Sequence, residues 1–217
     1  MKPFLDHWVI VDTGSTDGTQ DVIREALRGI PGELHERPWK DFGHNRTEAI
    51  RLAEGMADYL LLCDADMALV ANDPEWKSGL SADAYLVRQR HGALSYGNIR
   101  LINARTEGDK RWRYWGATHE YVDCVKPGTP HCKDTISSIE FLDFADGGSK
   151  SDKYIRDARL LEAEIAEIEA LERKAADNPD DTALQEAAAQ QHPLMVRDVF
   201  YLAQTYRDME NEDEKSF

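Results

Sequence analysis

The sequence is short of positive charge. Lys and Arg together number 26 against 41 Asp and Glu, which leaves a formal net charge of −15 at pH 7. Proteins that bind nucleic acid non-specifically neutralise phosphates with Lys and Arg, so we expect no nucleic-acid partner. A phosphate-bearing ligand would need a local source of positive charge here. A divalent cation held by the surplus carboxylates is such a source.

Cysteine and long apolar runs are also scarce. The three cysteines are odd in number and show no C-x-x-C spacing, which argues against a disulfide framework and suits a reducing compartment. We expect them to be free, buried thiols. No run of about 18 apolar residues is present, and the N-terminus has no basic-then-apolar leader pattern. The sequence therefore predicts a cytoplasmic protein without a transmembrane segment.

The 217 residues suffice for one main domain and a small appendage. Apolar runs and helical spacing alternate along the first part of the chain, with strands expected at residues 8–11, 33–37 and 58–63 and helices at 19–27 and 45–54. Such alternation predicts βαβ units and a parallel sheet. The apolar run at 58–63 is typical of a strand covered on both faces.

The pattern changes in the second half of the chain. Strands are expected at residues 85–90 and 94–102, on either side of a reversal at 91–92, so this part of the sheet should be antiparallel or mixed. After residues 147–148 the spacing becomes helical. Ser151 or Asp152 is expected to cap a long helix, and two more helices are predicted at 182–191 and, beyond Pro193, at 195–209. The predicted organisation is a core at residues 1–150 and a helical extension at 151–217.

Carboxylates follow two of the predicted strands. Asp12 ends the first, and Asp64 and Asp66 follow the strand at 58–63. Ligands of parallel sheets bind beyond the carboxyl ends of the strands, and aspartates at positions i and i+2 can share one hard cation with a diphosphate. Mn²⁺ or Mg²⁺ on such a pair would stabilise the charge of a departing diphosphate.

Simpler interpretations remain open for several of these residues. Asp17 or Thr19 can cap the following helix while Gly14 and Gly18 supply turn geometry. A zinc site is a further alternative, but the four zinc-compatible residues match no closed tetrahedral spacing; they are His119, Cys124, His131 and Cys132.

Four segments together resemble family 2 glycosyltransferases. They are WVIVDTGSTDGT at residues 8–19, WKDFGHNR at 39–46, YLLLCDAD at 59–66 and WGATHE at 115–120. The resemblance covers residues 8 to about 160 and extends to GGSKSDK at 147–153. It implies an α/β fold of the GT-A type, with a Rossmann-like mixed sheet flanked by helices and followed by an α-helical appendage.

The resemblance also implies roles for particular residues. It places Asp12 at the nucleobase, Arg46 near the base or the phosphates, and Asp64 and Asp66 at the ribose and the metal. The alternative for Arg46 is an ordinary surface ion pair, which contributes little to stability. The implied donor is a nucleotide-diphosphate sugar, with a UDP-sugar expected.

The segment WGATHE offers a candidate base. A carboxylate can take the proton of an acceptor hydroxyl, so we assign that role to Glu120 and expect His119 to bind the metal or a phosphate. Adjacent side chains of an extended segment point opposite ways, so only one of the two should face the site. Trp115 is expected either as an apolar floor for a sugar ring or as core packing.

This chain departs from the family at its start. Members normally begin with a strand and helix that carry a K-N-E-like segment, which we do not find before residue 8. The expected consequences are an incomplete base pocket and an exposed sheet edge through which copies could associate. We therefore predict a metal-dependent, inverting glycosyltransferase whose activity is impaired by this gap. The alternative is an inactive nucleotide-binding or scaffold module that binds a partner through its helical tail.

Overall fold

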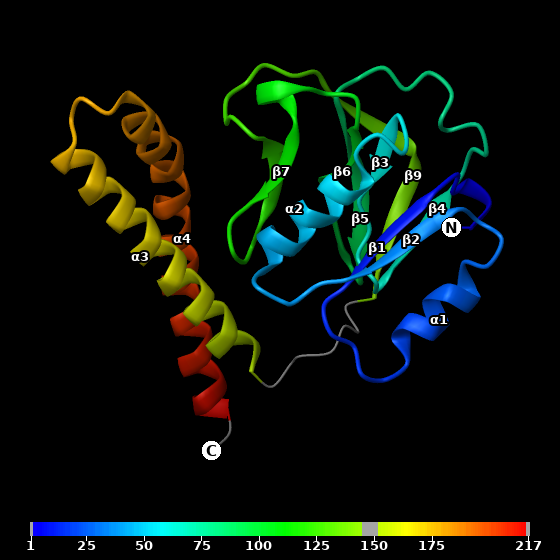
Figure 1. Cartoon of the computed structure of the whole chain (residues 1–217). Coiled ribbons are helices and arrows are strands. Elements are labelled where there is room, and N and C mark those ends of the chain that lie inside the picture. Colours follow the sequence, from blue (N-terminus) through cyan, green and yellow to red (C-terminus); the bar gives the residue numbers. More distant parts are fainter. Residues whose placement is uncertain (1, 145–151, 216–217) are drawn as a thin grey trace.

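The computed structural model describes residues 2–144 and 152–215. An α/β body built from the first range stands beside a hairpin of two long helices built from the second (Figure 1). This arrangement confirms the predicted α/β class, with a mixed sheet flanked by helices and a helical C-terminal region. It is compatible with the GT-A fold.

The chain begins with a strand, a helix and a strand. These are β1 (Trp8–Asp12), α1 (Thr19–Ala26) and β2 (Gly32–Glu36), preceded by a short 3-10 turn (Lys2–Phe4). β1 and β2 pair in parallel, as predicted. Gly18 precedes α1 with a φ of 86°, and the carboxylate of Asp17 accepts the backbone N–H of Thr19 at 3.1 Å. Asp17 and Gly18 therefore shape the turn that starts α1, in line with the structural alternative.

A five-stranded sheet forms the centre of the body. Its members, in the spatial order β3-β6-β5-β9-β4, are β3 (Tyr59–Leu61), β6 (Leu94–Asn103), β5 (Ala84–His91), β9 (Lys133–Asp143) and β4 (Met67–Ala71). β5 and β6 are an antiparallel hairpin that reverses at Gly92, where φ is 56°. β5 pairs in parallel with β9, so the sheet is mixed, as predicted.

The structure corrects the expectation for the third strand. β3 has only three residues, all half-buried, and it pairs antiparallel with β6 rather than joining β1 and β2 in one sheet. A pocket of about 180 Å³ separates β1 from β3, lined by Val9, Ile50 and Leu60 among others. Within the described ranges, neither β1 nor β3 has a strand partner on the edge toward this pocket. Tyr59 and Leu61 pack against one hydrophobic cluster, while Leu60 and Leu62 pack against a second, so both faces of this strand are covered, as predicted.

α2 (Phe42–Ala53) and a small ribbon of β7 (Trp112–Trp115) and β8 (Tyr121–Cys124) complete the body, with a 3-10 turn at Gly108–Lys110 before β7. Asp41 caps α2, because its carboxylate accepts the backbone N–H of His44 at 2.6 Å. Gly43 meets the loop that follows β7 so closely that a Cβ would lie 2.2 Å from the carbonyl oxygen of Gly116. This contact holds α2 against that loop.

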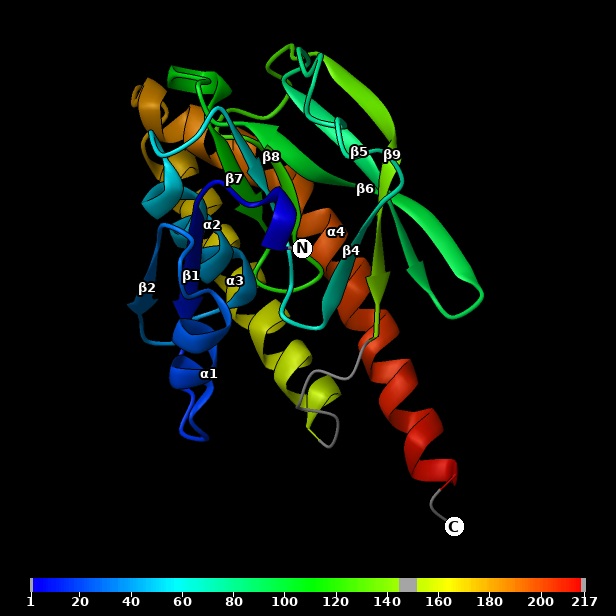
Figure 2. The ribbon, with the colours of Figure 1, turned by 90° about the vertical axis from the view of Figure 1, so that its right-hand side faces the viewer.

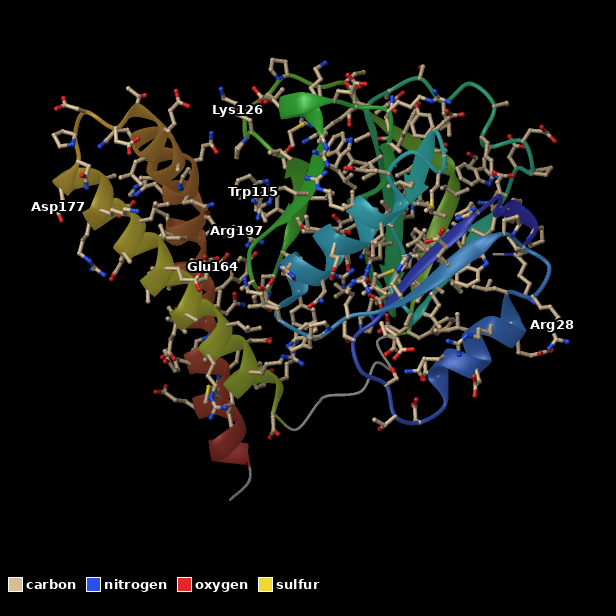
Figure 3. All side chains as sticks on the ribbon, viewed as in Figure 1. Arg28, Trp115, Lys126, Glu164, Asp177 and Arg197 are labelled. Carbon is tan, nitrogen blue, oxygen red and sulfur yellow. The ribbon has the colours of Figure 1, made fainter. Side chains whose placement is uncertain are left out.

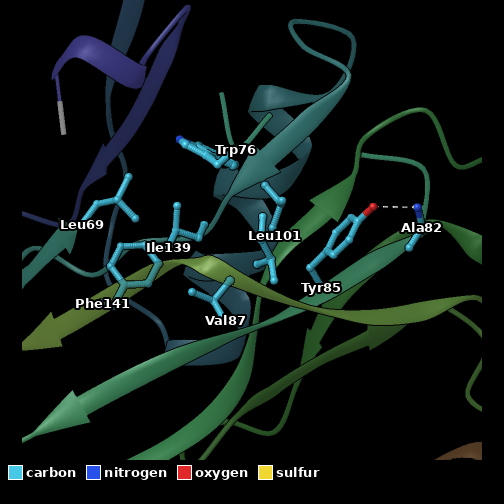
Figure 4. Close-up of a cluster of buried hydrophobic side chains, with 9 residues drawn as sticks. Leu69, Trp76, Ala82, Tyr85, Val87, Leu101, Ile139 and Phe141 are labelled. Atoms are coloured by element: carbon cyan, nitrogen blue, oxygen red, sulfur yellow. Dashed lines mark hydrogen bonds between the residues drawn. The ribbon is translucent and has the colours of Figure 1, made fainter. Parts of the chain in front are cut away.

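Side chains on one face of the five-stranded sheet form the main core (Figure 4). Val87, Leu101, Ile139 and Phe141 are each no more than 1% exposed. Each contributes about 1.5 to 3 kcal/mol by leaving water. Tyr85 ties the loop before β5 to this core, because its hydroxyl accepts the backbone N–H of Ala82 at 2.9 Å.

The C-terminal hairpin consists of α3 (Lys153–Asp177) and α4 (Thr182–Lys215), which run side by side (Figures 1 and 2). Leu161 and Ile168 of α3 are buried. The prediction of separate helices on either side of Pro193 was wrong, since α4 continues through it. Leu194 packs against Trp115 and Ile168, and this tertiary contact outweighs the hydrogen bond that proline cannot make.

The cysteines are free, as expected, but only one is buried. Cys124 lies in the core, whereas Cys63 and Cys132 are exposed. Both exposed residues lie just outside regular strands, at positions where the chain leaves or enters the sheet.

Candidate active site

A polar pocket of about 500 Å³ opens between α2, β6, the loop after β7 and α4. Its charged and aromatic lining includes Arg46, Asp64, Arg100, His119, Glu120 and Tyr201. A larger pocket of about 680 Å³ lies between α2, β7 and the helical hairpin, but none of the predicted site residues lines it. The smaller pocket is therefore the candidate site, because it unites four of the predicted residues.

Arg46 is the centre of this pocket. It projects from α2, donates a hydrogen bond from Nη1 to Asp64, and places Nε 2.7 Å from Oε1 of Glu120. Its side chain is 30% exposed. Burial acts against the charged guanidinium, but Asp64 and Glu120 outweigh burial and raise the pKa of Arg46. Arg46 therefore does form ion pairs, but with half-buried carboxylates of the pocket; its contact with a ligand stays a prediction.

Arg100 is a second cation that our sequence analysis missed. It is 7% exposed, and its Nη1 lies 3.1 Å from Oδ2 of Asp64. Gln89 accepts hydrogen bonds from Nε and Nη2 of Arg100 at 3.2 and 2.9 Å, and in turn donates to Asp143 at 2.8 Å. The signal in the sequence was a lone arginine within the apolar end of β6, where an unpaired charge is costly to bury.

The two arginines decide the ionisation of Asp64. Burial disfavours the carboxylate, but Arg46 and Arg100 outweigh burial and lower the pKa of Asp64. Both of its oxygens are engaged, one by each guanidinium. A cation on Asp64 would have to displace one of these contacts.

Asp66 fits a metal better than Asp64. Its side chain is half-buried, and no hydrogen bond or ion pair engages its carboxylate within the described ranges. Carboxylate oxygens are the ligands that Mg²⁺ and Mn²⁺ prefer. However, Asp66 does not line the pocket, and Asp64, Asp66 and His119 do not form a close set of ligand atoms in residues 2–144 and 152–215. The predicted ligand set is thus not assembled in this conformation.

Asp12 lies apart from the arginine cluster. Its Oδ1 accepts the backbone N–H groups of Gly14 and Ser15, each at 2.8 Å, and the side chain of Gln20 at 3.2 Å. The hydrogen bonds from Ser15 lower the pKa of Asp12 against the opposing effect of burial. Asp12 therefore organises the loop after β1, and it does not line the pocket that holds Arg46.

His119 and Glu120 both line the pocket, contrary to the expectation that only one would. The reason is the backbone of His119, whose φ of 51° interrupts the extended path between β7 and β8. The ring of His119 also stacks on Tyr201 of α4, with centroids 4.3 Å apart and planes 8° from parallel. Burial is the main cause that lowers the pKa of His119. No sequence pattern pointed to Tyr201.

Trp115 belongs to the core and not to the floor of the pocket. It is 2% exposed, packs with Ile168 and Leu194, and donates from Nε1 to the carbonyl of Cys124 at 3.0 Å. Figure 3 shows Trp115 with Glu164 and Arg197 where the body meets the hairpin. The second of the two expectations for Trp115, core packing, is the one that the structure shows.

The proposed zinc quartet is also not assembled. Among the described residues, the ligand atoms that come within 4.8 Å of one another belong to Asp123, Cys124 and His131. His119 and Cys132 are not part of this group, and Nδ1 of His131 is already 2.8 Å from the carbonyl of Thr129.

Residues 3–76 match the family described as Glycosyl transferase family 2. We call residues 3–76 the family 2 segment. It contains β1 through β4 and carries Asp12, Arg46, Asp64 and Asp66. No curated protein matches the chain. In the part of the chain that the structure describes, no helix is both long and apolar enough to cross a membrane.

The family 2 segment ends before the rest of the pocket begins. Arg100, His119, Glu120 and Tyr201 all lie beyond residue 76. The family match therefore supports glycosyl transfer in general through the first part of the site, while the geometry joins the later residues to it.

Proposed function

We propose that this chain transfers a sugar from a nucleotide-diphosphate sugar to an acceptor hydroxyl. The observation that supports this most is the position of Arg46, which links Asp64 of the family 2 segment to Glu120 of the later segment in one pocket. A cation between two carboxylates on different elements is suited to a reaction that brings an anionic donor next to a base.

The donor end of the proposed site is the cluster around Arg46 and Arg100. Guanidiniums can form paired hydrogen bonds with a diphosphate, which would take the place of Asp64 or Glu120 as their partner. Asp12, at the end of β1, is the proposed contact for the base, for which we expect uracil. Asp66 would hold Mn²⁺ or Mg²⁺, which when bound stabilises charge on the departing diphosphate. Roles for Asp64 and His119 as further ligands stay predictions.

The acceptor end is Glu120. Its carboxylate is the proposed general base that removes the proton of the acceptor hydroxyl as that oxygen attacks the anomeric carbon. A single displacement of this kind leaves the product inverted. Arg46 holds Glu120 beside the donor cluster, so the acceptor oxygen would approach the anomeric carbon from the side opposite the departing diphosphate. A cytoplasmic location and association of copies through a free strand edge also stay predictions.

The test is turnover of defined donors. Purified chain is incubated with UDP-glucose, UDP-galactose, UDP-N-acetylglucosamine or GDP-mannose, with Mn²⁺ or EDTA and a panel of monosaccharide acceptors, and nucleoside diphosphate release is measured. We expect release with at least one donor and loss of release with EDTA. Glu120→Gln should lower the rate about a hundredfold or more, since general base catalysis contributes on this scale.

Asp180→Ala is the matched control for substitution of a site carboxylate, because Asp180 is exposed and lies outside the pocket. It should leave the rate unchanged. A folded chain that neither binds nor turns over any of these donors, with or without metal, contradicts the proposal. A thermal-shift series with UDP would show donor binding separately, because a ligand of the folded state raises the melting temperature.

A further inference from the structure

The C-terminal helix α4 contacts the loop that carries the proposed base. Arg197 donates a hydrogen bond from Nη2 to the backbone carbonyl of His119, and Tyr201, one turn further along, stacks on the His119 ring. The Arg197 guanidinium also lies over two rings, 4.9 Å from the centroid of Tyr121 and 4.7 Å from that of Tyr201. Arg197 and Tyr201 thus form one continuous set of contacts on both sides of Glu120 in the sequence.

The hairpin holds the start of the same loop as well. Glu164 of α3 accepts the backbone N–H of Ala117 at 2.6 Å. Trp115, at the end of β7, packs with Ile168 of α3 and Leu194 of α4. The segment from residue 115 to residue 121 is therefore bound by the hairpin at its beginning, middle and end.

These contacts matter because the loop has a conformation that it would not adopt by itself. His119, with its φ of 51°, is the one residue other than glycine with positive φ in the described ranges. That conformation costs free energy for a residue with a Cβ, so it needs support from its surroundings. The hydrogen bond from Arg197 and the stack with Tyr201 supply this support, and they keep Glu120 aimed at Arg46.

We propose that Arg197 and Tyr201 are positioning residues for Glu120, so that the helical hairpin is a working part of the active site. The assignment of Glu120 as base rests on the function proposed above, whereas the positioning itself can be measured without turnover. Tyr201 acts through its ring. Its hydroxyl makes no hydrogen bond within the described ranges.

The first measurement follows the His119 ring by NMR. Arg197→Gln should shift the ring proton resonances of His119, because it removes the hydrogen bond that Arg197 donates to the backbone carbonyl of this residue. Tyr201→Leu should shift the ring proton resonances by removing the stacked ring. The signal is assigned by its loss in His119→Gln.

The second measurement is kinetic. Arg197→Gln and Tyr201→Leu should each lower kcat about tenfold or more while the KM for the donor changes less than about threefold, because a misplaced base slows the chemical step and leaves the donor cluster intact. Tyr201→Phe keeps the ring and should retain kcat. A purely structural role would lower stability and leave kcat per folded molecule unchanged.

Matched controls lie on the same helix. Arg207 is an exposed arginine that pairs with Asp208, and Tyr206 bonds to Glu162, both away from the pocket. Arg207→Gln and Tyr206→Leu should change neither the His119 signals nor kcat.

The outcomes separate the two proposals. If Arg197→Gln and Tyr201→Leu are folded and change neither the His119 resonances nor kcat, the positioning proposal is wrong. If Arg197→Gln does not fold, Tyr201→Leu compared with Tyr201→Phe decides. If the wild-type chain turns over no donor, the proposed function fails, while the NMR comparison still decides whether α4 holds the loop.

Discussion

Nε of Arg46 lies 2.7 Å from Oε1 of Glu120. The first residue belongs to α2, within the family 2 segment, and the second belongs to the loop after β7, outside it. This ion pair joins the two parts of the sequence into one pocket. Substitution of Arg46 should therefore affect both carboxylates at once.

Removal of Arg46 should damage both stability and donor binding. Arg46→Ala leaves the half-buried carboxylates of Asp64 and Glu120 without this partner, so we expect a loss of about 1 to 3 kcal/mol of unfolding free energy. Arg46→Lys keeps the charge but cannot reach both carboxylates with a planar fork, and should fall between alanine and wild type. Urea unfolding and UDP titration measure the two effects. Equal stability of Arg46→Ala and wild type would show that the ion pairs contribute nothing.

Asp66 should carry the metal dependence. Asp66→Ala is expected to abolish the effect of Mn²⁺ on donor binding, because this carboxylate has no competing partner in the described residues, whereas Asp64 has two arginines. Titration of Mn²⁺ followed by electron paramagnetic resonance, with UDP present, is the measurement. Asp180→Ala should bind as wild type does. Retention of tight Mn²⁺ binding by Asp66→Ala would show that the metal binds at other residues.

Truncation of Trp115 should loosen the hairpin from the body. Trp115→Ala removes a side chain that is 2% exposed and contacts both helices, so we expect about 3 to 5 kcal/mol lower stability. Trp115→Phe should cost less because it keeps part of the packing. Hydrogen exchange of the amides of α3 and α4 tests the location of the effect. Uniform destabilisation with no preferential exchange in the hairpin would contradict it.

Stability should fall as the pH rises through the neutral range, because of Asp198. Asp198 is fully buried beside Glu164, and burial together with this neighbour raises its pKa to about 8. Between pH 4 and 8 the folded state therefore keeps a proton that the unfolded chain has lost, which lowers the unfolding free energy as pH rises. Asp198→Asn should flatten this slope and be more stable than wild type at pH 8, on the order of 1 kcal/mol.

Urea unfolding at several pH values between 5 and 8 measures this slope. Asp180→Asn, at an exposed position of the hairpin, is the control and should keep the wild-type slope. An unchanged slope in Asp198→Asn would show that this carboxyl is not protonated in the folded state.

Local patterns in the sequence predicted most elements, and tertiary contacts explain the errors. Alternating apolar spacing located β5 and β6, and turn residues marked the start of α1. Pro193 suggested a helix end, but the burial of Leu194 keeps α4 continuous. The apolar run at 58–63 correctly indicated a strand covered on both faces, but not its partner, since β3 pairs antiparallel with β6 and lies in a different sheet from β1 and β2.

The residues of the site were predicted where short motifs contain them and missed where only tertiary contacts place them. Arg46, Asp64, His119 and Glu120 were found because they belong to short motifs, and the structure brings them together. Arg100 and Tyr201 were missed because their roles depend on which side of a strand or helix meets the pocket. Asp12 ends a strand as predicted, but that strand does not pair with β3, and Asp12 does not line the pocket that holds Asp64.

The proline within α4 has a mechanical consequence. Pro193 has no amide proton, so the carbonyl one turn earlier in α4 lacks its usual donor, and bending at this point meets less resistance than elsewhere in the rod. Leu194, just beyond it, is fixed to the body, and Arg197 begins the next turn. Bending of α4 is therefore expected at Pro193, next to the residues that contact the His119 loop. The turns of α4 before Pro193 can then move while Leu194 and Arg197 keep their contacts with the body.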